Sequence, residues 1–427
     1  MSVKVTPRSR FRAFVKEIAF TFGARIVAIL SMLGVSVLTA RVLGPSGRGD
    51  YFLVITLAGV IAQFCNLGMH SGNTYYSAKN PDEAGNLAVN SGWVSILVGG
   101  GASLAVIAIM SVHQNSPGIW YAAILVPANL FFLFGCSLLI GLELTSWFNA
   151  LQLSAYLLLL ALIACGVRLH LSTSGFLGLT SLAWSVSALG LLGLLLRRMR
   201  SWRFSYPTFL SSVHYSSKAY FTCLFGLLVL RANVFLLRYW QGSESVGYFS
   251  VAAQMADALG TLPVVVAMLL FPKLVRDRKN SWHLMVQALL RLTVVMVLLC
   301  ILAGVLAKPF IRIMYGVAFF KTVQVFLWIL PGVFFLALAG ILSQYLSAMD
   351  FPLAQVAIWA AGLAFIFVLS NVFISRFGVA GASLALSVDH AFIFCMLLLL
   401  ALRLRNNGVK QTDVSSSLPI SPSLGEL

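Results

Sequence analysis

Twelve long apolar segments, separated by short polar connections, run through this chain. Each has about the 20 residues that a helix needs to cross a bilayer, where lipid offers no partner to an unpaired backbone group. We therefore expect an all-α integral membrane protein with about 12 transmembrane helices. The segments cover residues 18–40, 51–72, 87–110, 119–141, 150–167, 175–196, 219–239, 247–271, 284–307, 323–346, 353–374 and 379–402.

The chain also matches itself at an offset of 197 residues. RVLGPSGRGDYF begins at Arg41 and RYWQGSESVGYF begins at Arg238, each between two apolar segments. The motif Gly-x-x-Gly opens a final apolar segment at Gly175 and again at Gly378. We interpret this as an internal duplication, with two pseudo-symmetric six-helix lobes around a central cavity, an arrangement typical of carriers. The predicted parts are a basic N-terminus (1–17), an N-lobe (18–196), a basic linker (197–217), a C-lobe (218–402) and a disordered tail (403–427).

Composition and charge agree with a membrane protein. Hydrophobic residues make up 60% of the chain and charged residues 10%, whereas soluble domains are about 25% charged. The net charge of +17 does not indicate a nucleic-acid partner, because eighteen of the 29 Lys and Arg fall on the N-terminal side of the predicted spans and only eight, including Arg41 and Arg48, on the other. The positive-inside rule then places both termini in the cytoplasm. Six dispersed cysteines and the lack of a nucleotide-binding loop predict no metal, no cofactor and no enzymatic activity.

Polar side chains recur on one face of corresponding spans in the two halves. The first set is Thr56, Gln63, Asn66, His70 and Asn73, and the second is Ser250, Gln254, Asp257 and Thr261. Their spacing follows the helical period, so each set shares a face. Such faces avoid lipid and either line a wet cavity or bind neighbouring helices.

Five charged residues lie within predicted spans: Arg25, Arg231, Arg291, Asp257 and Asp389, the last beside His390. An ionised group at mid-bilayer costs about 2.5–3.5 kcal/mol, so it must be paired, hydrated or functional. The arginines could alternatively snorkel to the interface. The acids could relay protons or sodium, or they could neutralise a buried arginine.

Short motifs spread along the chain resemble those of Wzx-type polysaccharide (O-antigen) flippases. That family belongs to the superfamily of MATE multidrug exporters and lipid II flippases. The motifs are Leu43-Gly44-Pro45 followed by Gly47, Gly49 and Tyr51; Leu67-Gly68; Val246-Gly247-Tyr248; Leu270-Phe271-Pro272; Tyr315-Gly316; and Asn371 followed by residues 377–382. Relatives often carry an acidic residue where Asn66 and Asn233 stand, which weakens any cation-coupling role at these two positions.

The resemblance implies a bacterial inner-membrane flippase that moves oligosaccharide linked to polyprenyl pyrophosphate from the cytoplasmic to the outer leaflet, in lipopolysaccharide or exopolysaccharide synthesis. Its partners would be the lipid-linked oligosaccharide, membrane lipids and a glycan polymerase or ligase. Substrate binding would fall to Arg25, Arg291, Arg231, Gln63, Asn66, His70, Asn73 and Gln254, and ion coupling to Asp389 and Asp257. The alternatives are a cation-coupled multidrug exporter of the MATE type, with an apolar and acidic cavity, and a membrane glycan polymerase or ligase, which the short loops disfavour.

Overall fold

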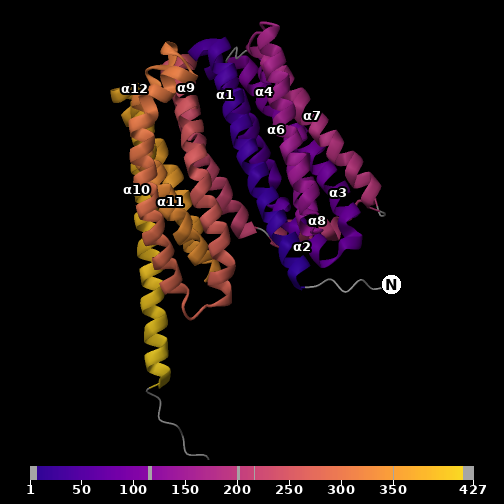
Figure 1. The fold of residues 1–427 in the computed structure, drawn as a ribbon, viewed down its shortest axis with the longest axis vertical. Helices are drawn as coiled ribbons and strands as arrows, with labels where there is room; N and C mark the ends of the chain where they lie inside the picture. Colours follow the sequence, from indigo (N-terminus) through magenta and orange to yellow (C-terminus); the bar gives the residue numbers. More distant parts are fainter. Residues whose placement is uncertain (1–6, 114–117, 200–201, 216, 350, 417–427) are drawn as a thin grey trace, which may run out of the picture.

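The computed structural model describes residues 7–113, 118–199, 202–215, 217–349 and 351–416, and every regular element in these ranges is helical (Figure 1). Nine of the helical segments there are long and apolar enough to span a membrane. The elements are α1 (Pro7–Asn66), α2 (Met69–Lys79), η1 (Pro81–Glu83), α3 (Ala84–Trp93), the π-helical η2 (Val94–Gly100), α4 (Gly101–His113), η3 (Ile119–Tyr121), α5 (Ala122–Gly141), α6 (Thr145–Arg168), α7 (Thr173–Arg198), α8 (Tyr206–Tyr215), α9 (Ser217–Arg276), α10 (Ser281–Met314), η4 (Val317–Phe319), α11 (Thr322–Ala348) and α12 (Leu353–Ser416).

Three of the nine segments turn back on themselves at a glycine, so that each contains two spans. The bends are at Gly44, Gly242 and Gly378, with φ of 65°, 76° and 62°, values that strain any residue with a Cβ. In α1 the guanidinium of Arg48 bonds to the Thr39 hydroxyl at 2.7 Å, although nine residues of straight helix would separate them by about 13 Å. Counting both arms of each hairpin confirms the twelve predicted spans.

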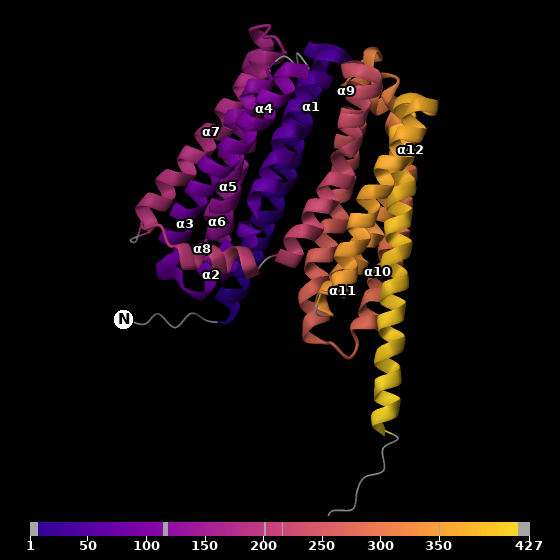
Figure 2. The same cartoon turned by 180° about the vertical axis from the view of Figure 1, so that it is seen from behind.

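The helices form two groups, with α1 to α7 in the N-lobe and α9 to α12 in the C-lobe (Figures 1 and 2). The lobes meet through α1 and α9 at the end that carries the glycine bends, drawn at the top of Figure 1. From there they diverge towards the end at which the N-terminus lies. We call these the bend end and the N-terminal end.

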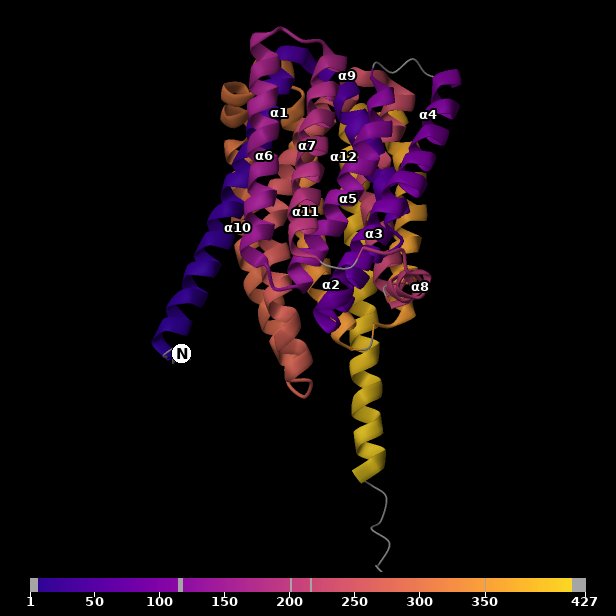
Figure 3. The ribbon, with the colours of Figure 1, turned by 90° about the vertical axis from the view of Figure 1, so that its right-hand side faces the viewer.

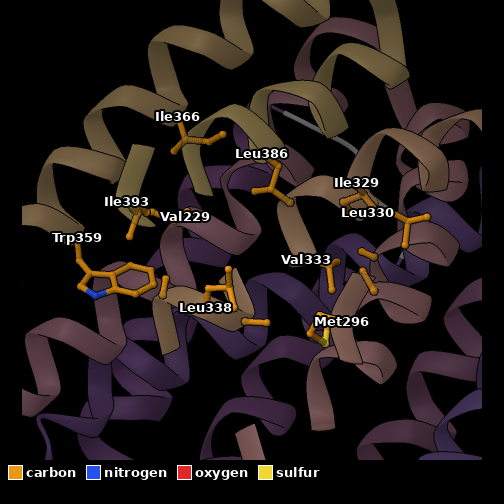
Figure 4. Close-up of a cluster of buried hydrophobic side chains, with 14 of the residues drawn as sticks. Val229, Met296, Ile329, Leu330, Val333, Leu338, Trp359, Ile366, Leu386 and Ile393 are labelled. Carbon is orange, nitrogen blue, oxygen red and sulfur yellow. The ribbon is translucent and has the colours of Figure 1, made fainter. Parts of the chain in front are cut away.

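Apolar side chains both fill the lobes and cover their outer surface. The C-lobe core brings Val229 of α9 together with residues of α11 and α12 (Figure 4). In contrast, the most apolar window of α10 has a mean hydropathy of 2.7, yet only 11% of it is buried. A surface this apolar is stable against lipid tails and not against water.

Two elements differ from the sequence-based expectation. The predicted linker contains α8, which lies across the long helices (Figure 3) and rests on α2 and α3. Ten residues with several hydroxyl groups gave no long apolar run to reveal it. The tail expected to be disordered from residue 403 continues as helix in α12 to Ser416, and residues 417–427 lie outside the described ranges.

Candidate functional site

A cavity of about 460 Å³ lies between the lobes. Both arms of the α1 hairpin and both arms of the α9 hairpin contribute to its wall, and α6 contributes Tyr156. The polar groups on the wall are Arg25, Thr56, Tyr156, Arg231, Gln254, Asp257 and Thr261. The central cavity therefore combines two guanidiniums with hydroxyl, amide and carboxylate groups.

The guanidinium of Arg231 forms an ion pair with Asp257 inside this cavity. One terminal nitrogen lies 2.8 Å from Asp257 Oδ2, and the two side chains are 22% and 46% exposed. The guanidinium also lies over the Phe52 ring, 5.9 Å from its centroid. Because both side chains are partly exposed to the cavity, an ion that enters the cavity can replace one partner of the pair. Of the two sequence-based interpretations of Asp257, the geometry places it as the counter-ion of an intramembrane arginine.

Arg48, which the sequence placed between the first two predicted spans on the side opposite the N-terminus, is fully buried at the bend end of the cavity. It donates hydrogen bonds to Thr39 and to Gln254 Oε1, both at 2.7 Å. Since Gln254 belongs to the C-lobe, this contact joins the lobes at the roof of the cavity. The sequence-based interpretation missed this burial because a charged residue beside Gly and Pro resembles a loop. The signal that could have corrected it is Pro45, which commonly opens a helix and so places Arg48 within a first turn.

Arg48 has no acidic partner at ion-pair distance within the described part of the chain. Its guanidinium instead lies against the rings of Tyr51 and Phe52, at 5.3 and 5.8 Å from their centroids. Phe52 therefore has two guanidinium neighbours, Arg48 and Arg231.

The bend end is closed by contacts between the lobes. Asp50 accepts a hydrogen bond from Ser243 at 2.5 Å and lies 3.4 Å from the Arg238 guanidinium. Arg41 donates to the backbone carbonyls of Ile313 and Met314. The backbones also approach closely, because a Cβ at Gly49 would collide with the Ser243 carbonyl and one at Gly247 with the Pro45 carbonyl. Contacts from both lobes thus close the central cavity at the bend end.

Most of the polar stripe on the second span serves the N-lobe itself. Asn66 and His70 bond to each other at 2.9 Å, and Asn73 donates to Ser91 at 2.8 Å. Gln63 is half-buried and is absent from the lining of the central cavity, where Thr56 is the member of the stripe that contributes. In the C-lobe, Gln254, Asp257 and Thr261 do line the cavity. One stripe therefore holds helices together, and the other faces the cavity.

Two further predicted site residues lie elsewhere. Arg291 is exposed on α10 and is not part of the central cavity wall. Asp389 is fully buried in the C-lobe, and neither carboxylate oxygen has a hydrogen-bond partner among the described residues. Its neighbour His390 donates from Nδ1 to the Gly332 carbonyl at 3.0 Å, which leaves Nε2 as a free acceptor.

Comparisons with known proteins place this geometry in context. The profile of a family described as "Polysaccharide biosynthesis protein" matches residues 14–278. A search of curated proteins finds no match. Among solved structures, the lipid II flippase MurJ in an inward closed conformation is 16% identical and has a TM-score of 0.68, with 91% of this chain and 87% of that chain covered.

Transporters of the MATE type share the fold as well. An inward-facing MATE family transporter of the MOP superfamily is 14% identical with a TM-score of 0.68, covering 90% of this chain and 96% of its own. A MOP superfamily transporter from Pyrococcus furiosus is 13% identical with a TM-score of 0.66, covering 92% and 95%. These matches confirm the resemblance inferred from the sequence at the level of family and fold.

Proposed function

Since the chain belongs to the polysaccharide biosynthesis protein family, we propose that it is a bacterial inner-membrane flippase for oligosaccharide linked to polyprenyl pyrophosphate. It takes its cargo from the cytoplasmic leaflet, releases it in the outer leaflet by alternating access, and supplies a glycan polymerase or ligase there. The N-terminal end then faces the cytoplasm and the bend end faces outward. The chain itself catalyses no covalent step.

The observation that carries this proposal is the pair of cavity arginines. Arg25 is exposed on the cavity wall, and Arg231 lies on the same wall beside Phe52. A diphosphate entering a low-dielectric space needs fixed cations with several donors, which guanidinium supplies. Tyr156, Thr56 and Gln254 offer an aromatic face, a hydroxyl and an amide to the sugars.

Cargo binding has a defined consequence for the ion pair. A diphosphate can replace the Asp257 carboxylate as the ligand of Arg231, because both are oxyanions that accept from the same donors. Asp257, 46% exposed, then turns to water or takes up a proton. The carboxylate thus keeps Arg231 neutralised while the cavity is empty.

The test is outward movement of lipid-linked oligosaccharide by the purified protein in proteoliposomes. Transport above that of protein-free vesicles, together with accumulation of cargo on the inner leaflet of cells that lack the protein, is the expected result. Cells that lack it and still export the glycan at the normal rate would refute the proposal.

A second candidate is a multidrug exporter. It is favoured by the exposed carboxylate of Asp257 in the cavity and by the likeness of fold to MATE transporters. An exporter of cationic drugs would move tetraphenylphosphonium in the same proteoliposomes and would not move a prenyl-linked glycan. The two guanidiniums on the wall disfavour a cationic cargo by charge repulsion.

We also propose that Asp389 couples transport to an ion gradient. Its carboxylate is buried and has no partner among the described groups, and the adjacent His390 has a free acceptor nitrogen. Among the described residues, no ring of oxygen ligands of the kind that sodium requires surrounds Asp389. This favours a proton as the coupling ion.

A further inference from the structure

A second cavity, of about 660 Å³, lies inside the C-lobe between α9, α11 and α12. Its volume falls within the roughly 300–1,000 Å³ of pockets that hold small organic molecules. Arg231 and Asp257 line both this cavity and the central one, so the two spaces meet at the ion pair. The C-lobe cavity therefore starts where the cargo's headgroup is proposed to bind.

The walls of this cavity are largely apolar. Phe249, Phe271 and Trp359 supply rings, while glycines and alanines of α9 and α11 leave the space open. At Gly260 and Gly340, on opposing helices, an added Cβ would have no heavy atom within 4 Å. Besides the ion pair, the polar side chains on the wall are Thr222, Ser343, Gln344 and His390. A sugar chain would leave most of its hydroxyl groups unpaired against such walls, at a cost for each group. A hydrocarbon chain meets no such cost.

We propose that the C-lobe cavity seats the first prenyl units of the cargo while the diphosphate lies at Arg231. This inference rests on the proposed function and names a binding position for the part of the cargo that is not sugar. In a prenyl diphosphate the hydrocarbon begins directly at the phosphate oxygen. A chain bound to the phosphate at Arg231 therefore enters an apolar space at once.

A phospholipid fits this position less well. Its phosphate is separated from the acyl chains by glycerol and two ester carbonyls, and those polar groups would stand where the cavity wall is apolar. Since a lipid tail leaves an equally apolar bilayer, seating it adds little hydrophobic free energy. The C-lobe cavity therefore helps to select and orient the cargo. It keeps the diphosphate at Arg231 until the lobes rearrange.

The native Cys223 gives a direct probe, because it is exposed and lines this cavity. In a variant that keeps Cys223 and replaces the other five cysteines by alanine, we would measure alkylation by N-ethylmaleimide. Farnesyl diphosphate at about ten times its dissociation constant should slow alkylation about tenfold, whereas inorganic pyrophosphate should leave it unchanged.

Filling the cavity provides the second measurement. Gly340→Leu and Gly260→Leu place a side chain in the open space without a clash at the first carbon. The control is Gly190→Leu, which adds the same side chain without a clash on the exposed face of α7, away from both cavities. Binding of radiolabelled farnesyl diphosphate should weaken about tenfold in the first two variants and remain unchanged in the control. A tenfold change corresponds to about 1.4 kcal/mol.

The outcomes separate this inference from the proposed function. Wild-type farnesyl diphosphate binding in Gly340→Leu and Gly260→Leu, combined with loss of binding in Arg25→Gln, overturns the C-lobe seat and leaves the flippase proposal standing. Equal protection of Cys223 by phosphatidylglycerol vesicles assigns the cavity to phospholipid and overturns the inference. Protection by tetraphenylphosphonium alone, with no binding of farnesyl diphosphate or pyrophosphate, refutes both proposals.

Discussion

Four arginines of the helical bundle differ in what surrounds them. Arg25 is exposed on the cavity wall, Arg231 pairs with Asp257, Arg48 is fully buried against aromatic rings, and Arg291 is exposed on α10. An unpaired charge buried in a low dielectric costs several kcal/mol. Arg48 is therefore the arginine with most to gain from a new partner when the lobes separate at the bend end.

The contrast between Arg25 and Arg291 gives a first prediction. Arg25→Gln should slow glycan transport at least about tenfold, since it removes a two-pronged donor from the cavity wall. The transport rate of Arg25→Lys should fall between those of the wild type and Arg25→Gln, because an ammonium keeps the charge and loses the planar pair of donors. The measurement is the initial rate of outward movement in proteoliposomes at matched protein levels.

Arg291 is the matched control, because it lies on α10 and outside the central cavity wall. Arg291→Gln should keep the wild-type rate within about twofold, as expected of a residue whose charge reaches the interface. Equal losses at the two positions would remove the distinction that the structure draws between them.

A second prediction concerns the buried carboxylate. Asp389→Asn keeps the shape of the side chain and removes the titrating group, so transport should no longer respond to an imposed proton gradient. Asp277→Asn, in the exposed connection between α9 and α10, should retain the response. Transport by Asp389→Asn that still follows the gradient would exclude this residue from coupling.

At the scale of elements, the spans were predictable and the contacts within the hairpins were not. A run of about 20 apolar residues identifies a span because the bilayer sets its length. The sequence also placed Gly44 and Gly242 between spans, yet it could not show that Arg48 folds back onto Thr39. Likewise, periodicity put Asn66, His70 and Asn73 on one face, while the bond from Asn73 to Ser91 depends on packing within the lobe.

The closed bend end leads to a third prediction. Gly49→Ala and Gly247→Ala introduce a methyl group against a backbone carbonyl of the other lobe, so they should push the lobes apart there and favour the outward-open form. A cysteine at Thr56, on the cavity wall, should then react faster with an impermeant thiol reagent added outside.

The controls for this prediction lie on the same two helices. At Gly59 and Gly260 a Cβ has no heavy atom within 4 Å, so Gly59→Ala and Gly260→Ala should leave the reactivity of the Thr56 cysteine unchanged. If all four alanine variants behaved alike, the close backbone approach would not be what holds the bend end shut.

For the whole molecule, a fourth prediction concerns sidedness. Phe204, just before α8, and Tyr239, close to the Gly242 bend, are 56% and 74% exposed. With the N-terminal end in the cytoplasm, a cysteine at Tyr239 should react with an impermeant reagent in intact cells, and one at Phe204 should react only after permeabilisation. The reverse pattern would invert the orientation and, with it, the direction assigned to transport.

The short join between α8 and α9 has a consequence for how cargo enters. α8 ends at Tyr215 on the N-lobe and α9 begins at Ser217 on the C-lobe, and nearby the Tyr220 hydroxyl donates to the Phe64 carbonyl across the lobes at 2.9 Å. One flank of the central cavity is thereby held together, because the two helices are separated by a single residue and a residue spans at most about 3.6 Å. This leaves the opposite flank, between the first arm of α1 and the second arm of α9, as the side from which a lipid with its tail in the bilayer would enter. For the proposed flippase, this geometry predicts that the cargo enters from one side of the central cavity and not from both.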